Sequence, residues 1–253
     1  MEDSSRKIRF LYYSSVSSTN LKARELLRNK VHSWTVIVAQ SQEKGYGKGE
    51  NPWFSPPGGL YFSLIIPEIS IKNIRLLTFI AAIAVTQSLR KKFNLEAVIK
   101  WPNDVLVPSQ NTLKKSSPLG FKKIAGILVE NVIGERSKNS IVGVGINTNI
   151  EKFPGSLLGK ATSILRQTAK SVNDKEILDF FLKGFQELFK ESEIDILNEY
   201  KKYEILRGRK VNVSFQDKKI SGTVCDFDKK GALMVKLKEG RIIRILEGIL
   251  ELV

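Results

Sequence analysis

Residues 100–107 read KWPNDVLV, a stretch in which a proline interrupts a run of strand-forming residues. Pro102 has no backbone N–H and disfavours helix at the residue before it, so the first strand ends there and the apolar run DVLV resumes it. A turn of this kind has a fixed backbone and presents Asn103 and Asp104. The pattern is equally typical of an Asx turn at a strand crossover and of a ligand-binding loop.

Two apolar runs that contain glycine follow, KIAGILVE at residues 123–130 and GVGINTN at residues 143–149. Their β-rich composition predicts two strands that pair as a hairpin around Gly134. Lys123 begins an apolar strand, where a lysine either snorkels to solvent or faces a ligand cavity. Glycine weakens a strand and is tolerated where another group approaches the backbone closely. Tight strand packing explains each glycine alone equally well, whereas glycines beside Lys123 indicate a narrow ligand with an anionic end.

Two further polar segments precede this region. SSTN at residues 17–20 follows a predicted strand and predicts a helix start, with Ser18 or Thr19 as the N-cap. Residues 42–53 read QEKGYGKGENPW, and the three alternating glycines free the backbone to turn and to wrap an anion with its N–H groups. This segment lacks the GxxxxGK[ST] pattern of a P-loop. The structural alternative for SSTN is a simple helix cap, and the alternative for residues 42–53 is a flexible surface loop.

The composition is that of an ordinary globular protein of 253 residues, with 42% hydrophobic and 26% charged residues. One cysteine and one histidine exclude an internal disulfide framework and a histidine-rich zinc site. The sequence shows neither a secretory signal nor the run of ~20 apolar residues that a membrane helix needs, so we expect a cytoplasmic protein. The net charge of +15 fits either an anionic partner or a solvated basic surface.

The chain divides into two predicted domains. Residues 1–203 mix strands with helices, and helical periodicity is found over 72–92, 173–190 and 194–206. Residues 204–253 carry short strands at intervals of roughly 8–12 residues, separated by Gly and Asp turns, which is the pattern of a small all-β barrel. The four strands predicted there are KVNVSF, KISGTVCDF, GALMVKL and RIIRILEG.

Taken in this order, the segments SSTN, Q-x-x-G-x-G, W-x-S-P-P-G-G-L-Y-F-S, KWPNDVLV, KIAGILVE and GVGINTN resemble biotin protein ligases over most of residues 10–150. The residues after 204 resemble the SH3-like C-terminal domain of that family. The resemblance implies an α+β fold, a mixed β-sheet with flanking helices of the class II aminoacyl-tRNA synthetase-like kind, plus a small SH3-like β-barrel. It also implies ATP-dependent activation of biotin to biotinyl-5′-AMP, with Mg²⁺, and transfer to a lysine of a biotin carboxyl carrier protein.

The resemblance assigns roles to particular residues. It implies that Lys123 is the catalytic cation at the biotin carboxylate and the α-phosphate, and that Asp104 orients or deprotonates the acceptor lysine. The implied biotin-binding residues are Ser18, Thr19, Asn20, Gln42, Gly45, Tyr46, Lys123, Gly126 and Gly143. The implied ATP-binding residues are Lys48, Trp53, Lys100, Asn103, Lys123 and Asn147. No residue is implied as a metal ligand.

The glycine loop departs from the family pattern, which reads Gly-Arg-Gly-Arg-x-Gly-Arg-x-Trp. Aligned on Gly45 and Trp53, this chain has the replacements Tyr46, Lys48, Glu50 and Asn51 where Arg, Arg, Gly and Arg are expected. Lysine keeps a charge and loses the bidentate fork of arginine, and the other replacements lose or reverse charge. We therefore hypothesise a weaker hold on ATP or on the adenylate.

The resemblance further implies an acidic carrier domain as partner, no membrane partner and a homodimer formed through a sheet edge. We expect no specific DNA binding, because the first predicted strand begins near residue 7 and leaves no room for a helix-turn-helix domain. Lipoate–protein ligase is the alternative enzyme, and a paralogue that binds biotin or adenylate without catalysis is a second alternative. A nucleic-acid-binding module has no RNP, KH or helix-turn-helix pattern to support it.

Overall fold

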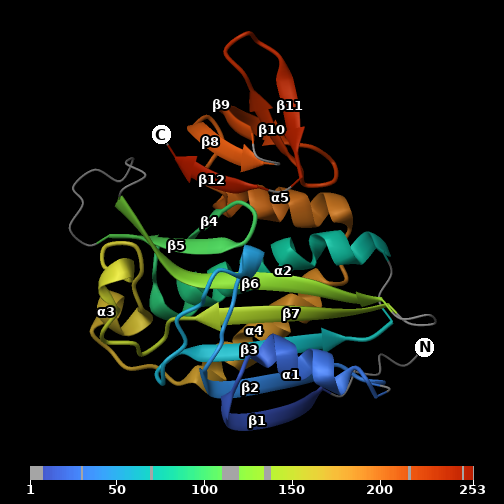
Figure 1. The fold of residues 1–253 in the computed structure, drawn as a ribbon, viewed down its shortest axis with the longest axis vertical. Helices are drawn as coiled ribbons and strands as arrows, with labels where there is room; N and C mark the ends of the chain where they lie inside the picture. Colours follow the sequence, from blue (N-terminus) through green and yellow to red (C-terminus); the bar gives the residue numbers. More distant parts are fainter. Residues whose placement is uncertain are drawn as a thin grey trace.

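The computed structural model describes residues 8–29, 31–68, 71–109, 120–133, 138–215, 218–246 and 248–252. These residues form a seven-stranded mixed sheet with helices on both faces and, beside it, a five-stranded antiparallel sheet built from the C-terminal residues (Figure 1). The α+β architecture predicted above is confirmed, and the second sheet agrees with a small SH3-like domain. Within the described part of the chain, no helix has both the length and the apolar character needed to cross a membrane.

The strands of the larger sheet are, in spatial order, β1 (Arg9–Val16), β2 (Thr35–Gln42), β3 (Leu60–Ile66), β7 (Lys138–Ile146), β6 (Phe121–Ile133), β5 (Asp104–Pro108) and β4 (Val98–Lys100). β1 and β2 are parallel, and the other neighbouring pairs are antiparallel. The helices are α1 (Thr19–Leu26), α2 (Ile71–Phe93), α3 (Ile164–Thr168), α4 (Asp174–Leu188) and α5 (Glu193–Tyr203). The predicted pairing of β6 with β7 is confirmed, and its predicted turn at Gly134 lies outside the described residues.

Both faces of the larger sheet are covered, which explains why its central strands read as continuous apolar runs. Alternate residues point to opposite faces of a strand. Val36, Leu64 and Val142 join the large core beneath α2 and α4. Their neighbours on the opposite face pack against Ala23 of α1, and they are Ile37, Ile65 and Ile141.

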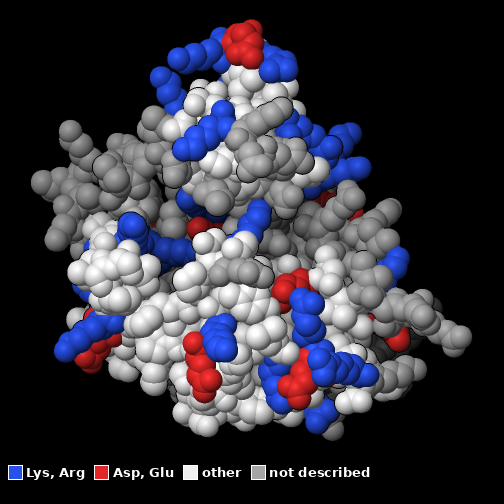
Figure 2. Space-filling model, viewed as in Figure 1, with Lys and Arg blue, Asp and Glu red and all other residues white. Residues whose placement is uncertain are grey.

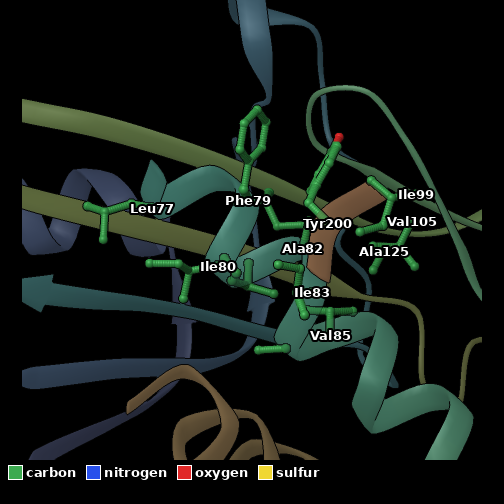
Figure 3. Close-up of a cluster of buried hydrophobic side chains, with 14 of the residues drawn as sticks. Leu77, Phe79, Ile80, Ala82, Ile83, Val85, Ile99, Val105, Ala125 and Tyr200 are labelled. Carbon is green, nitrogen blue, oxygen red and sulfur yellow. The ribbon is translucent and has the colours of Figure 1, made fainter. Parts of the chain in front are cut away.

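Helix α2 is the centre of the larger core. Its side chains from Leu77 to Val85 lie against β4, β5 and β6 and against Tyr200 of α5 (Figure 3). The rings of Phe79 and Tyr200 have centroids 4.2 Å apart. Ile99 and Trp101, on either side of the end of β4, belong to the same core as α2, so α2 fixes the position of the turn that follows β4.

The C-terminal sheet has the strand order β11 (Ile242–Ile245), β10 (Leu233–Lys236), β9 (Lys218–Phe227), β8 (Lys210–Phe215) and β12 (Ile249–Leu252). All four predicted segments form strands, and the residues that follow RIIRILEG form a fifth strand, β12, that was not predicted. The chain ends β11 at Ile245 and then forms β12 along the far edge, paired with β8. A strand of four residues carries too little periodicity to be recognised from sequence.

Apolar side chains of this second sheet join the large core, and a hydrogen bond, a ring contact and an ion pair add to this packing. The Nε1 atom of Trp101 donates to the carbonyl oxygen of Gly231 at 3.1 Å. The ring of Tyr200 lies edge-on to that of Phe227, with centroids 5.8 Å apart. The Nζ atom of Lys201 lies 2.8 Å from Oδ1 of Asp226. The turn after β4 is therefore fixed from the core side by α2 and α5 and from the other side by the C-terminal sheet.

Glu204 ends α5 between the two sheets. It is 8% exposed, and its carboxylate accepts from the backbone N–H groups of Leu206 at 2.6 Å and Arg207 at 3.2 Å. Burial raises its pKa from 4.5 to about 7, against the opposing effect of these donors and of nearby arginine charges. The extended backbone at Glu204 also explains why α5 stops at Tyr203 and not at 206.

We expect the stability of the protein to fall as the pH rises from 5 to 7.5, in part because of Glu204. The folded state keeps a proton on this carboxyl that the unfolded chain releases, so its contribution is complete at low pH and is lost through pH 7. The substitution Glu204→Gln removes this titration and should lessen the fall in unfolding free energy by about 2 kcal/mol. Urea unfolding of both proteins at the two pH values measures the difference, and identical pH slopes would contradict the assignment.

Candidate functional site

A pocket of about 230 Å³ lies where the glycine loop, the start of α1, the middle of β6 and β7 and the turn after β4 meet. Two residues of the C-terminal sheet, Gly248 and Leu250, complete its wall. The pocket gathers most of the predicted site residues, namely Ser18, Thr19, Asn20, Gln42, Tyr46, Lys48, Trp53, Lys100, Asn103, Asp104, Lys123, Gly126 and Gly143. Segments separated by more than 200 residues thus form one site.

One end of the pocket is neutral and polar. Of the two predicted candidates, Ser18 is the N-cap of α1 and Thr19 is the first helical residue, but the Ser18 side chain makes no capping hydrogen bond. The Oε1 atom of Gln42 does this instead, accepting from the backbone N–H of Thr19 at 2.8 Å and from its hydroxyl at 3.1 Å. The hydroxyl of Ser18 therefore has no capping role and lines the pocket. Neutral donors and acceptors of this kind suit an uncharged polar group of a ligand.

The glycines of β6 and β7 let two side chains approach the strands closely. A Cβ atom on Gly143 would lie 2.2 Å from Oδ1 of Asn20, and one on Gly145 would lie 2.4 Å from Nε1 of Trp53. A Cβ atom on Gly126 would lie 3.0 Å from the indole ring of Trp53. The two interpretations of these glycines are therefore compatible, because the groups that pack tightly on the strands are themselves part of the pocket wall.

The opposite end of the pocket is charged. The Nζ atom of Lys123 lies 2.6 Å from Oδ1 of Asp104, and both side chains are partly exposed. The same Nζ atom lies 4.9 Å from the centre of the Trp53 ring, within the range of a cation–π interaction. The ladder between β5 and β6 shifts register between Val105 and Leu106, next to this pair. A cation at the end of a narrow slot is suited to neutralise an anion.

The glycine loop is folded over the slot by its own hydrogen bonds. Gly47 N donates to Asn51 O and Trp53 N donates to Gly45 O, each at 2.8 Å. Gly49 has a φ of 64°, in the left-handed region that favours glycine. The indole Nε1 of Trp53 is buried and has no hydrogen-bond partner among the described residues. This atom faces Gly145 of β7, so the tryptophan of the loop packs directly on the strand.

Two predicted site residues do not line the pocket. Gly45 lies behind the wall, where a Cβ atom would be 2.5 Å from Oγ of Ser55. Asn147 is buried, and its Nδ2 atom donates to Thr162 O at 2.9 Å. Asn103 lines the pocket, but its Nδ2 atom donates to Ile127 O at 2.8 Å and so ties the turn to β6.

The sequence analysis missed a residue that supports the pocket wall and two residues that line the pocket. Glu130 lies on β6 and binds side chains from α1 and from the glycine loop. Its signal was present, because it is the acidic residue that ends the apolar run KIAGILVE. Leu250 belongs to the unpredicted strand β12, and Gly248 immediately precedes that strand. No local sequence pattern indicated either residue.

A second cavity of about 570 Å³ continues from the pocket toward the C-terminal sheet. The two cavities share lining residues of the glycine loop, the turn after β4 and β6. The second cavity is lined by the basic residues Lys48, Lys230 and Arg244, and by Leu246, whose side chain is largely exposed. Figure 2 shows Lys and Arg side chains spread over the C-terminal sheet, at the top of the view, with few Asp and Glu among them.

The described residues contain no group of three or more His, Cys, Asp and Glu side chains that could hold a metal ion. Asp104 is the carboxylate that lines the pocket, and it is paired with Lys123. A magnesium ion often binds one carboxylate and takes its remaining ligands from substrate phosphates and water. The described donor set is therefore not an all-protein metal cage, and it is compatible with a magnesium ion that takes its other ligands from a bound phosphate and water.

The chain is similar in sequence to known proteins. The model of the Biotin/lipoate A/B protein ligase family matches residues 12–147. The Bifunctional ligase/repressor BirA of Bacillus subtilis is 30% identical over 244 residues, which cover 91% of this chain and 70% of that protein. The Biotin--[acetyl-CoA-carboxylase] ligase of Paracoccus denitrificans is 31% identical over 177 residues, covering 66% of this chain and 68% of that protein.

A solved structure extends the similarity to the C-terminal sheet. The biotin protein ligase from Aquifex aeolicus, in complex with biotin and ATP, superposes with a TM-score of 0.79 at 27% sequence identity. The superposition covers 97% of this chain and 98% of that one.

Proposed function

Because the chain belongs to the biotin/lipoate A/B protein ligase family, we propose that it activates biotin with Mg-ATP and transfers it to a lysine of a biotin carboxyl carrier protein. The observation that carries this proposal is the arrangement of the pocket. A neutral polar end at Ser18 and Gln42 and a cationic end at Lys123 are joined by a glycine-lined slot. Biotin has the same order of groups, a neutral ureido ring at one end and a carboxylate at the other.

Biotin would enter with its ring toward α1. Ser18, Thr19 and Gln42 offer hydroxyl and amide groups to the ureido ring, and the glycines of β6 and β7 leave room for the valeryl chain. The aliphatic chain directs the carboxylate toward Nζ of Lys123. Binding energy at the ring end thus fixes the position of the reacting group at the other end.

In the first step, a carboxylate oxygen of biotin attacks the α-phosphorus of ATP, and pyrophosphate leaves with the bonding electron pair. Both reactants are anions, so their approach requires positive charge at the reacting atoms. Lys123 supplies it from β6, and Lys48 and Lys100 line the same space. Mg²⁺ enters with ATP as part of the substrate. The step needs positioning and charge more than a protein nucleophile.

In the second step, the amine of the acceptor lysine attacks the carbonyl carbon of biotinyl-5′-AMP, and AMP leaves. An amide bond forms, and the amine loses a proton. The carboxylate of Asp104 lies 2.6 Å from Nζ of Lys123, so it lies beside the position of the anhydride. Asp104 can orient the incoming ammonium group and accept its proton.

The carrier protein reaches the pocket through the second cavity. It opens between the glycine loop and the C-terminal sheet and shares Trp101 and Asn103 with the pocket. Lys48 and Lys230 make its lining basic, Arg244 is paired with Asp228, and Leu246 adds an exposed apolar side chain. An acidic carrier domain complements this surface, and opposite charges increase the rate of productive encounter.

We expect transfer to the carrier to slow as salt rises, because charges are screened beyond ~10 Å at 0.1 M ionic strength. Lys230→Glu should raise the KM for the carrier about tenfold and leave carrier-free adenylate formation unchanged. Lys229→Glu is the matched control, since it changes the same charge on the neighbouring residue, which does not line the cavity. Labelling kinetics with a purified carrier domain measure both variants. Equal effects of the two substitutions, or a flat salt profile, would contradict this approach.

Lipoate is the competing substrate within the family. The dithiolane ring of lipoate has no group to replace the hydrogen bonds of a ureido ring, and a site built of polar groups rejects an analogue that leaves them unpaired. The polar end formed by Ser18, Thr19 and Gln42 therefore favours biotin. Pyrophosphate release with Mg-ATP and either acid tests this directly. Release with biotin alone is expected, and release with lipoate alone would reverse the assignment.

A further inference from the structure

The glycine loop has a contact that its family resemblance does not explain. Tyr46 occupies a position where the family pattern has arginine. Its hydroxyl donates to Oε2 of Glu130 at 3.0 Å, across 84 residues of sequence. Tyr46 lines the pocket, whereas Glu130 lies on β6 outside the pocket lining.

Glu130 binds the start of α1 as well. The same Oε2 atom accepts from Nδ2 of Asn20 at 2.8 Å, and Oε1 accepts from Nη2 of Arg24 at 2.8 Å. The Glu130 side chain is 18% exposed, so these bonds are partly shielded from water. Hydrogen bonds to a carboxylate are shorter and stronger than those between neutral groups. One carboxylate therefore connects the glycine loop to Asn20 at the polar end of the pocket.

Backbone contacts connect Tyr46 to the rest of the glycine loop. Tyr46 forms a bridge with Pro52, next to Trp53, and Gly47 N donates to Asn51 O. A fixed Tyr46 side chain therefore restrains the loop backbone from Tyr46 to Trp53. The loop cannot lift from the pocket without separating Tyr46 from Glu130.

We propose that Tyr46 and Glu130 form a latch that keeps the glycine loop closed and retains the adenylate between the two reaction steps. This inference rests on the proposed function, because it requires an adenylate to be formed. Tyr46, a neutral donor, stands where the family pattern has an arginine, and the carboxylate of Glu130 is its partner. Tyr46 and Glu130 are positioning residues in this scheme, since they act through the loop.

The test is the rate at which bound adenylate escapes. Protein is loaded with radiolabelled biotin and Mg-ATP, freed of excess ligand by gel filtration and chased with unlabelled biotin. Tyr46→Phe removes the hydroxyl and keeps the ring. We expect escape to be about 10- to 100-fold faster, the range for loss of a hydrogen bond to a charged group, and a smaller change in the rate of adenylate formation. Tyr12→Phe, on the exposed ring of β1, is the control and should leave escape unchanged.

A double-mutant cycle separates a latch from two independent structural effects. Glu130→Ala should speed escape at least as much as Tyr46→Phe, and Tyr46→Phe should have no further effect in the Glu130→Ala background. Additive effects, or wild-type retention by Tyr46→Phe, would overturn the latch alone. A wild-type protein that forms no adenylate would overturn the proposed function and the latch together.

Discussion

Lys123→Ala should reduce the rate of biotinyl-5′-AMP formation by about 1,000-fold, the largest effect that we expect of any single substitution. The Nζ atom of Lys123 is the cation at the end of the slot, where two anions must approach each other. Without it, the developing negative charge is neutralised only by the Mg²⁺ that enters with ATP and by the other lysines of the pocket. Pyrophosphate release under single-turnover conditions measures the loss.

Lys122→Ala is the matched control for this prediction. Lys122 precedes Lys123 on β6, so its side chain points to the opposite face of the strand, and it does not line the pocket. We expect it to retain the wild-type rate. Lys123→Arg should recover part of the activity, because it keeps the charge and changes its geometry. A Lys123→Ala protein within tenfold of the wild-type rate would show that the reacting atoms lie elsewhere.

Gly143→Ala should weaken biotin binding by at least about 100-fold. The added Cβ atom would lie 2.2 Å from Oδ1 of Asn20, far inside van der Waals contact. Asn20 has no freedom to retreat, because its Oδ1 accepts from Ser63 Oγ at 2.6 Å and its Nδ2 is held by Glu130. The polar end of the pocket must therefore shift, and a displacement of about 1 Å at a binding group can cost about 100-fold. Isothermal titration with biotin measures the affinity.

Gly155→Ala is the control for this prediction, since an added Cβ atom there meets nothing within 4 Å. It should bind biotin with wild-type affinity. Asn20→Ala removes the same wall without inserting an atom, and it should also weaken binding while the thermal transition stays cooperative. A folded Gly143→Ala protein with unchanged affinity would place the ring of biotin away from Asn20.

The sequence predicts those parts of the fold that depend on local patterns. Apolar runs identified β6 and β7, the 3.6-residue period identified α2, and Ser18 or Thr19 was expected at the start of α1. These features depend on neighbouring residues along the chain, so they can be read from it. The motifs also identified most of the residues that line the pocket, because their turn residues and strand glycines meet around it.

The features that sequence did not reveal depend on contacts between distant segments. The bond that caps Thr19 comes from Gln42, the bond that fixes Trp101 comes from Gly231, and Tyr46 is held by Glu130. Each of these partners is an ordinary residue in its own segment, and its role appears only once the sheet is assembled. The same reason explains why β12 was missed, since β8 provides its hydrogen bonds.

The chemistry of the pocket is tested most directly by a single-turnover reaction. Wild-type protein is incubated with biotin and Mg-ATP, the bound product is identified by mass spectrometry, and a purified biotin carrier domain is then added. We predict that biotinyl-5′-AMP forms on the protein and that the biotinyl group then appears on one lysine of the carrier as AMP is released. Biotin binding without adenylate, or an adenylate that never labels the carrier, would contradict the proposed ligase and favour a paralogue that only binds.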